Sequence, residues 1–188
     1  MILIINCGSS KTPYIEQAVD AICDYQSIGM NDLNSSELQN FDGIIISGAP
    51  ILITEVDTTP YQKLFSWIPN HNKPILGICF GHQMLGLSFG AFASRQREDR
   101  DWQLIEQMSE SILFNKLPQE FEMMEDHCES ISIPANFNLI ASSDVCVNEA
   151  MQHKDLPFFG VQFHPEVSGN LGYILIENFV ELCLTKKS

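Results

Sequence analysis

The chain has 188 residues, of which 45% are hydrophobic and 18% charged, a composition typical of a folded globular protein rather than a disordered chain. Its formal charge of −14 repels phosphate backbones and anionic lipid, so we expect no nucleic-acid partner. No apolar run approaches the roughly 20 residues that span a bilayer, and the first residues lack the basic lead of a signal peptide, so we expect a soluble cytoplasmic protein with no membrane association.

Three segments in the first half of the chain share a pattern that predicts a strand followed by a loop. Residues 2–5 are continuously apolar, and Pro13 lies at a plausible first turn of the helix that follows. The apolar run recurs at 44–46 and again at 74–78, where it precedes a predicted helix over 80–89. Apolar strands that alternate with helices indicate a parallel sheet buried on both faces.

The second half begins with shorter strand-like segments. Residues 121–124 and 139–141 predict short strands separated by polar turns, which favours an antiparallel or mixed flank. A strong strand at 158–163 and an amphipathic helix over 169–184 complete the pattern. We therefore predict an α/β fold, an open and mostly parallel sheet with flanking helices and a smaller antiparallel or mixed flank. No repeat or Gly/Ser linker interrupts it, so we expect a single domain over 1–188.

The sharpest motif is GICFGHQ at 77–83, which places Cys79 where a buried strand ends and a helix begins. It has the G-x-nucleophile-x-G pattern of a nucleophile elbow, whose glycines allow close backbone passage. A helix N-terminus favours both a thiolate and an adjacent oxyanion. We expect the Phe80 N–H to donate to that oxyanion, together with the loop of Gly48 and Ala49 that ends the neighbouring strand. Taken alone, the motif also fits a small buried residue at a tight junction.

A cysteine nucleophile requires an imidazole to transfer protons and an acceptor that orients the imidazole. His164 directly follows the strong strand at 158–163, and Glu166 lies two residues further on. Side chains two apart on an extended backbone project to the same side. The sequence therefore predicts a Cys79, His164 and Glu166 constellation, although the His-Pro-Glu tripeptide by itself also fits a solvated loop.

The remaining histidines and cysteines carry weaker signals. The six cysteines contain no CxxC pair, which indicates reduced, mostly buried thiols. Packing or solvent exposure accounts for His71 and His82. His127 next to Cys128 lacks a second ligand cluster, so no metal is predicted. Phosphate-binding glycine motifs are missing from the sequence, and we therefore expect no cofactor and no use of ATP by this chain alone.

All three arginines of this acidic chain fall within six residues, at Arg95, Arg97 and Arg100. The simplest interpretation is a solvated turn. The alternative is a docking point for an acidic partner or an anionic ligand.

The chain contains three motifs in a fixed order, SGAP at 47–50, GICFGHQ at 77–83 and PFFGVQFHPEV at 157–167. In these motifs and their order it resembles the class I glutamine amidotransferase family. Within that family, the segment NEAMQH at 148–153 is most similar to the separate glutaminase subunits of GMP synthases. The resemblance implies hydrolysis of the glutamine side-chain amide through a γ-glutamyl thioester on Cys79, with the imidazole as acid and base.

The same resemblance implies residues for substrate binding and a partner protein. Gln83 matches the family's glutamine-binding position, and the backbone of Asp126, His127 and Cys128 matches the segment that lines the amino-acid end of the substrate. Glutamine is the implied substrate, and ammonia would pass to a separate ATP-using synthetase subunit, most readily that of GMP synthase.

One departure from the family pattern concerns the oxyanion loop, which usually reads SGGP but here has Ala49 at the second glycine. A Cβ at this position penalises positive φ, so a donor that must turn inward could be held back. Ala49 therefore keeps open a non-catalytic regulatory module on the same fold. A stand-alone γ-glutamyl peptide hydrolase with the same catalytic residues also stays open, because its thioester chemistry is identical and only the leaving amine differs.

Overall fold

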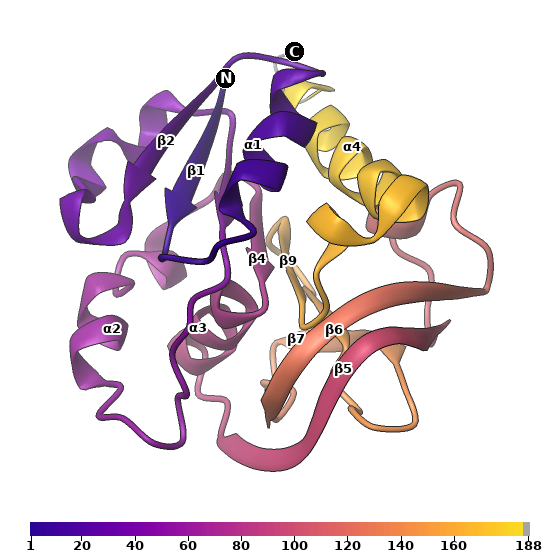
Figure 1. Ribbon diagram of the computed structural model, residues 1–188. Coiled ribbons are helices and arrows are strands. Elements are labelled where there is room, and N and C mark those ends of the chain that lie inside the picture. Colours follow the sequence, from indigo (N-terminus) through magenta and orange to yellow (C-terminus); the bar gives the residue numbers. More distant parts are fainter. Residues whose placement is uncertain (186–188) are drawn as a thin grey trace.

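The computed structural model describes residues 1–185, in which nine strands form one sheet in the order β2-β1-β3-β4-β9-β8-β7-β5-β6 (Figure 1). Its parallel strands are β1 (Ile2–Asn6), β2 (Tyr25–Gly29), β3 (Gly43–Ile46), β4 (Ile75–Ile78) and β9 (Phe158–Val161). Its antiparallel strands are β5 (Ala93–Gln107), β6 (Glu120–Ile131), β7 (Phe137–Ser142) and β8 (Ala150–His153). The predicted fold class, a parallel sheet with an antiparallel flank, is confirmed.

Helices cover both faces of the parallel strands, which explains why those strands are apolar throughout. The helices are α1 (Thr12–Asp20), α2 (Thr59–Leu64), α3 (Phe80–Ser88) and α4 (Gly169–Thr185). Alternate residues of a strand point to opposite faces. Ile2 and Ile4 of β1 accordingly pack in the core formed with α1 and α4, whereas Leu3 and Ile5 pack in the core formed with α3. None of the helices within residues 1–185 is long and apolar enough to cross a bilayer.

The antiparallel flank differs from the sequence prediction in length. The segment predicted as short strands contains β5 with 15 residues and β6 with 12, paired along most of their length into a ribbon (Figure 1). Many of its residues are charged and exposed, so the sequence pattern of this segment does not predict long strands. The edge strand β2 was not predicted either, because its sequence YQSIG is half-exposed and lacks a continuous apolar run.

The sheet brings the ends of three predicted strands together. Ser47 follows β3, Cys79 follows β4, and His164 lies three residues after β9. These strands are parallel neighbours in the sheet, so their carboxyl ends meet at one edge, where ligands of open α/β sheets gather.

The first turn of α3 lies against the sheet at a distance that only glycine permits. A Cβ on Gly77 would lie 2.5 Å from the carbonyl carbon of Gly81, and a Cβ on Gly81 would lie 2.2 Å from the carbonyl oxygen of Ile46. Both contacts are with backbone, which cannot yield as a flexible side chain can. The steric reason given for the glycines of the elbow is therefore confirmed.

We predict that Gly81→Ala destabilises the protein by about 1–3 kcal/mol, because the overpacking against Ile46 outweighs the helix propensity that alanine adds. Gly29→Ala is the matched control, since its Cβ would meet only the end of the Asp32 side chain. Urea unfolding of both variants measures the difference. Equal midpoints for Gly81→Ala and the unmodified chain would contradict the close approach.

Candidate active site

Cys79 occupies a strained position between β4 and α3. It is the N-cap residue of α3 with φ 51° and ψ −106°, in the left-handed half of conformational space that a residue with a Cβ rarely adopts. Such strain costs of order 1–3 kcal/mol and persists where the surrounding structure imposes it. Here the Cys79 N–H donates to the Val161 carbonyl at 2.8 Å, and its carbonyl accepts from the Gln83 N–H at 3.0 Å. Cys79 lines a cavity and is 8% exposed.

His164 lies beside Cys79, and one of its two ring nitrogens is hydrogen-bonded to Glu166. His164 Nδ1 lies 2.8 Å from Glu166 Oε1, and both side chains are almost fully buried. The His164 N–H donates to the Met124 carbonyl at 2.8 Å, which fixes the backbone after β9. With Nδ1 held by the carboxylate, Nε2 is the ring nitrogen available to the thiol. The structure thus brings together the three residues that the sequence grouped.

The charges of this constellation reinforce one another. Burial alone would lower the pKa of His164, but the charge and hydrogen bond of Cys79 and those of Glu166 outweigh it and raise the pKa to about 10. The protonated imidazole is therefore favoured next to the thiol and the carboxylate, and a cation beside a cysteine is the setting that activates a cysteine nucleophile.

The loop after β3 lies against this pair. A Cβ on Gly48 would approach His164 Cε1 to 3.3 Å and Cys79 Cβ to 3.6 Å, so the loop backbone is in contact distance of both. Ser47 Oγ accepts from the Cys7 N–H and donates to the Gly48 carbonyl at 3.0 Å. In a trans peptide the next N–H points the opposite way, so Ser47 also fixes the direction of the Ala49 N–H. Ala49 does not have a positive φ.

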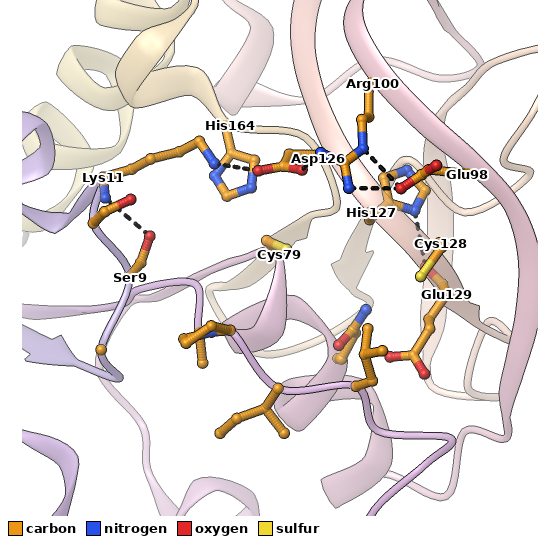
Figure 2. A pocket seen from close by; sticks show the side chains of 17 residues that line it. Ser9, Lys11, Cys79, Glu98, Arg100, Asp126, His127, Cys128, Glu129 and His164 are labelled. Carbon is orange, nitrogen blue, oxygen red and sulfur yellow. Dashed lines mark hydrogen bonds and ion pairs between the residues drawn. The ribbon is translucent and has the colours of Figure 1, made fainter.

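The cavity in front of Cys79 has a volume of about 490 Å³ and a charged mouth (Figure 2). Lys11 Nζ lies 2.7 Å from Asp126 Oδ2, and Arg100 lies 3.7 Å from the other oxygen of Asp126 and 2.6 Å from Glu98. Burial alone would raise the pKa of Asp126, but the hydrogen bond and charge of Lys11 lower it. The mouth therefore presents fixed positive and negative groups side by side.

The predicted site residues divide into those that line this cavity and those that lie behind it. Lining it are Ala49, Cys79, Gln83, Asp126, His127, Cys128 and His164. Glu166 lies behind His164, and the Phe80 side chain is buried in the core beside Phe65 and Tyr61, so Phe80 can reach the cavity only through its backbone N–H.

The arginine segment is not the solvated turn that we considered simplest. All three arginines lie on β5, with a register shift between Arg95 and Asp99 where the strand bulges. Two of these arginines form ion pairs at the surface, Arg95 with Glu55 and Arg100 with Glu98. Arg100 also lines the cavity, a position that the spacing of residues in the sequence could not predict.

Gln162 is a buried residue at the site that sequence reasoning missed. Its Nε2 donates toward Cys79 Sγ at 3.6 Å, and its Oε1 accepts from Gln83 Nε2 at 3.2 Å. The backbone N–H of Gln162 donates to the Glu149 carbonyl at 2.7 Å. Gln162 lies two residues before His164, and the same two-residue spacing that identified Glu166 would have found it.

The other two histidines considered from sequence are buried by packing. His82 fills the space that Gly160 leaves open, and burial lowers its pKa to about 3. The His71 ring packs edge-on against Trp67, and burial lowers its pKa to about 4. Both are thus neutral at physiological pH, as core histidines are.

Comparison with known proteins agrees with this fold. A family model described as "Glutamine amidotransferase class-I" matches residues 3–182. The chain therefore belongs to the class-I glutamine amidotransferase family.

The relatives narrow the comparison within the family. The chain is 38% identical over 155 residues to the glutamine-hydrolysing GMP synthase subunit of Pyrococcus abyssi, covering 80% of each chain. It is 32% identical to the protein of the same name from Methanocaldococcus jannaschii, covering 97% of each. The crystal structure of a candidate GMP synthase subunit from Thermoplasma acidophilum superposes with a TM-score of 0.90 at 31% identity, over 98% of this chain and 94% of that one.

We predict that Cys79→Ala lowers the pKa of His164 by roughly 1–3 units. In the variant only Glu166 raises this pKa, while burial still lowers it. NMR titration of the imidazole measures the midpoint, with His153, which packs among phenylalanine rings outside the site, as internal reference. The unfolded value is 6.5, so in the unmodified chain the stability contributed by this protonation is complete below about pH 6.5 and lost as pH rises through about 10. An unchanged midpoint in the variant would contradict the contribution of Cys79 to the pKa of His164.

Proposed function

We propose that this chain is the glutaminase subunit of a GMP synthase, which hydrolyses the side-chain amide of glutamine and supplies ammonia to an ATP-using synthetase subunit. The observation that carries the chemistry is the buried contact of Cys79 with His164, which Glu166 orients at 2.8 Å. The assignment to GMP synthase is supported by the relatives named above, which match over 80% to 97% of their lengths.

In the first half of the proposed reaction, the Cys79 thiolate attacks the amide carbon of glutamine and forms a C–S bond. Negative charge then develops on the amide oxygen, where the Phe80 N–H and an N–H of the loop at Gly48 and Ala49 donate hydrogen bonds. His164 gives its proton to the amide nitrogen, the C–N bond breaks, and ammonia leaves. The product on the protein is a γ-glutamyl thioester.

In the second half, His164 changes from acid to base for an electrostatic reason. The thiolate that raises its pKa is consumed in the thioester, so burial now favours the neutral imidazole. The neutral ring takes a proton from water as the water attacks the thioester, the C–S bond breaks, and glutamate leaves with the thiolate and imidazolium restored.

The charged mouth of the cavity fits the amino-acid end of glutamine. Lys11 and Arg100 are cations that suit the α-carboxylate, and Asp126 and Glu98 are anions that suit the α-ammonium group. We propose that the substrate replaces part of the Lys11–Asp126 pairing, while Gln83 lies deeper in the cavity near the side-chain amide.

We predict that Cys79→Ala lowers glutamate release from glutamine by roughly 10⁴-fold or more, because the thioester cannot form. Single-turnover assays of the purified chain, alone and with a GMP synthase synthetase subunit, measure this release. Cys23→Ala, at a thiol outside the cavity, serves as the control variant. Full turnover by Cys79→Ala would refute the nucleophile, and preferential cleavage of γ-glutamyl peptides would favour the peptide hydrolase.

We predict that Ala49→Gly raises kcat if the Gly48–Ala49 peptide turns inward during catalysis, because glycine removes the penalty on positive φ. One oxyanion donor accounts for roughly 2.7–4 kcal/mol of transition-state stabilisation, so a donor recovered only in part still gives a measurable increase. Steady-state kinetics of the variant with glutamine measure the change. If both proteins are silent with and without the synthetase partner, a non-catalytic module becomes the better interpretation.

A further inference from the structure

A second group of ionisable side chains lies beneath the strand that lines the cavity. Glu125 and His127 belong to β6, and Cys146 and Glu149 belong to the segment between β7 and β8; we call these four residues the buried cluster. Their exposed fractions are 1%, 8%, 0% and 0%. The proposed glutaminase reaction uses none of these four side chains at the reacting atoms.

The potential ligand atoms of the buried cluster converge. A ring nitrogen of His127, Cys146 Sγ and a carboxylate oxygen of Glu149 all lie within 4.8 Å of one another. Glu125 Oε2 lies 3.2 Å from His127 Nε2. Nitrogen, sulfur and carboxylate oxygen donors at such distances are the ligand types of zinc sites, whereas Mg²⁺ and Ca²⁺ prefer oxygen alone.

The hydrogen bonds around the buried cluster hold its donors in the orientation that a metal needs. His127 Nδ1 lies 2.9 Å from the Glu129 carbonyl and therefore carries the proton, which leaves the Nε2 lone pair facing the cluster. Ser143 Oγ donates to Glu149 Oε1 at 2.6 Å, which leaves Oε2 facing inward. A backbone carbonyl or side chain behind each ligand is the usual support of a metal-binding residue.

Several inward-facing atoms have no hydrogen-bond partner outside the buried cluster within residues 1–185. They are His127 Nε2, both carboxylate oxygens of Glu125 and Oε2 of Glu149. Their contacts are with one another, because Glu125 Oε2 faces His127 Nε2 and the Glu125 carboxyl group interacts with that of Glu149. Buried polar atoms without partners are rare and cost free energy, and buried carboxylates are normally paired or bound to a cation. Burial raises the pKa of Glu149 and the charge of Glu125 raises it further, a repulsion between carboxyl groups that a bound cation would relieve.

We propose that the buried cluster binds one Zn²⁺ through His127 Nε2, Cys146 Sγ and Glu149 Oε2, with the Glu125 carboxylate as the fourth ligand. Tetrahedral Zn²⁺ with bonds of 2.0–2.3 Å holds its ligand atoms about 3.5 Å apart, so the donors of His127, Cys146 and Glu149, now within 4.8 Å of one another, close by little more than about 1 Å. Glu125 lies outside that set of three but already contacts His127 Nε2 at 3.2 Å, from where it would turn toward the metal. The thiol gives up its proton on binding. Cys128, the neighbour of His127 in sequence, is not part of the set.

Four protein ligands leave no open position, so this zinc is structural. It ties the segment between β7 and β8 to β6, the strand that brings Asp126 to the cavity. The Glu149 carbonyl in turn accepts the Gln162 N–H, and Gln162 reaches Cys79. The metal would therefore brace the floor of the active site without contacting the substrate.

Metal titration of the full chain tests this site. The titration uses the Cys79→Ala variant, so that the thiol beside His164 cannot bind zinc. After chelation, we expect one equivalent of added Zn²⁺ to be retained and to raise the unfolding temperature. We expect Co²⁺ in its place to give a thiolate-to-metal charge-transfer band. Because the readout is metal binding by an inactive variant, it is independent of whether the glutaminase proposal holds.

Two further substitutions, each added to that background, locate the ligands. Cys146→Ala and Glu149→Gln should each weaken Zn²⁺ binding by about 100-fold or more, and the first should abolish the Co²⁺ band. Cys128→Ala is the matched control and should retain both. Glu149→Gln keeps the side-chain size, so it decides the question if Cys146→Ala fails to fold.

Two results would overturn the proposal. Retention of no Zn²⁺ by the folded chain would mean that the buried cluster shares protons instead, consistent with burial raising the pKa of Glu125 to about 8. A Co²⁺ band that survives Cys146→Ala, or that disappears in Cys128→Ala, would place the metal elsewhere.

Discussion

The site depends on how closely the first turn of α3 approaches the sheet. Glycines at 77 and 81 allow backbone contacts that any Cβ would block, with Ile46 as the nearest neighbour of the second. The chain therefore turns from strand to helix within one residue, and that residue, Cys79, is held at a φ of 51°. The tight turn leaves the thiol facing the cavity at the carboxyl ends of the strands instead of packing wholly into the core.

The second constraint is electrostatic, because three ionisable groups share a nearly dry environment. His164 is buried, yet Cys79 and Glu166 raise its pKa to about 10. In a low dielectric such mutual charges act strongly, so removing one partner changes the protonation of the next. In the proposed reaction, acylation of the thiol is itself such a removal, and it would let one imidazole serve as acid and then as base.

Sequence patterns predicted those elements best whose residues are uniform in character. The parallel strands are apolar on both faces, and their runs identified β1, β3, β4 and β9. The β5–β6 ribbon was predicted as short pieces because its exposed face carries charges such as Arg97 that resemble a turn. Ribbon length depends on pairing with a distant strand, and no local signal reports that pairing.

The sequence by itself determined the fold class, the nucleophile elbow and the His164–Glu166 pair, because each depends on residues adjacent in the chain or on one steric rule. Only the tertiary structure decided which distant side chains share a site. Lys11 meets Asp126 across 115 residues, and Gln162 meets Cys79 across 83. His127 likewise turns toward Cys146 and not toward Cys128, its neighbour in sequence. Such contacts follow from the order of strands in the sheet, which long-range packing sets and local sequence does not encode.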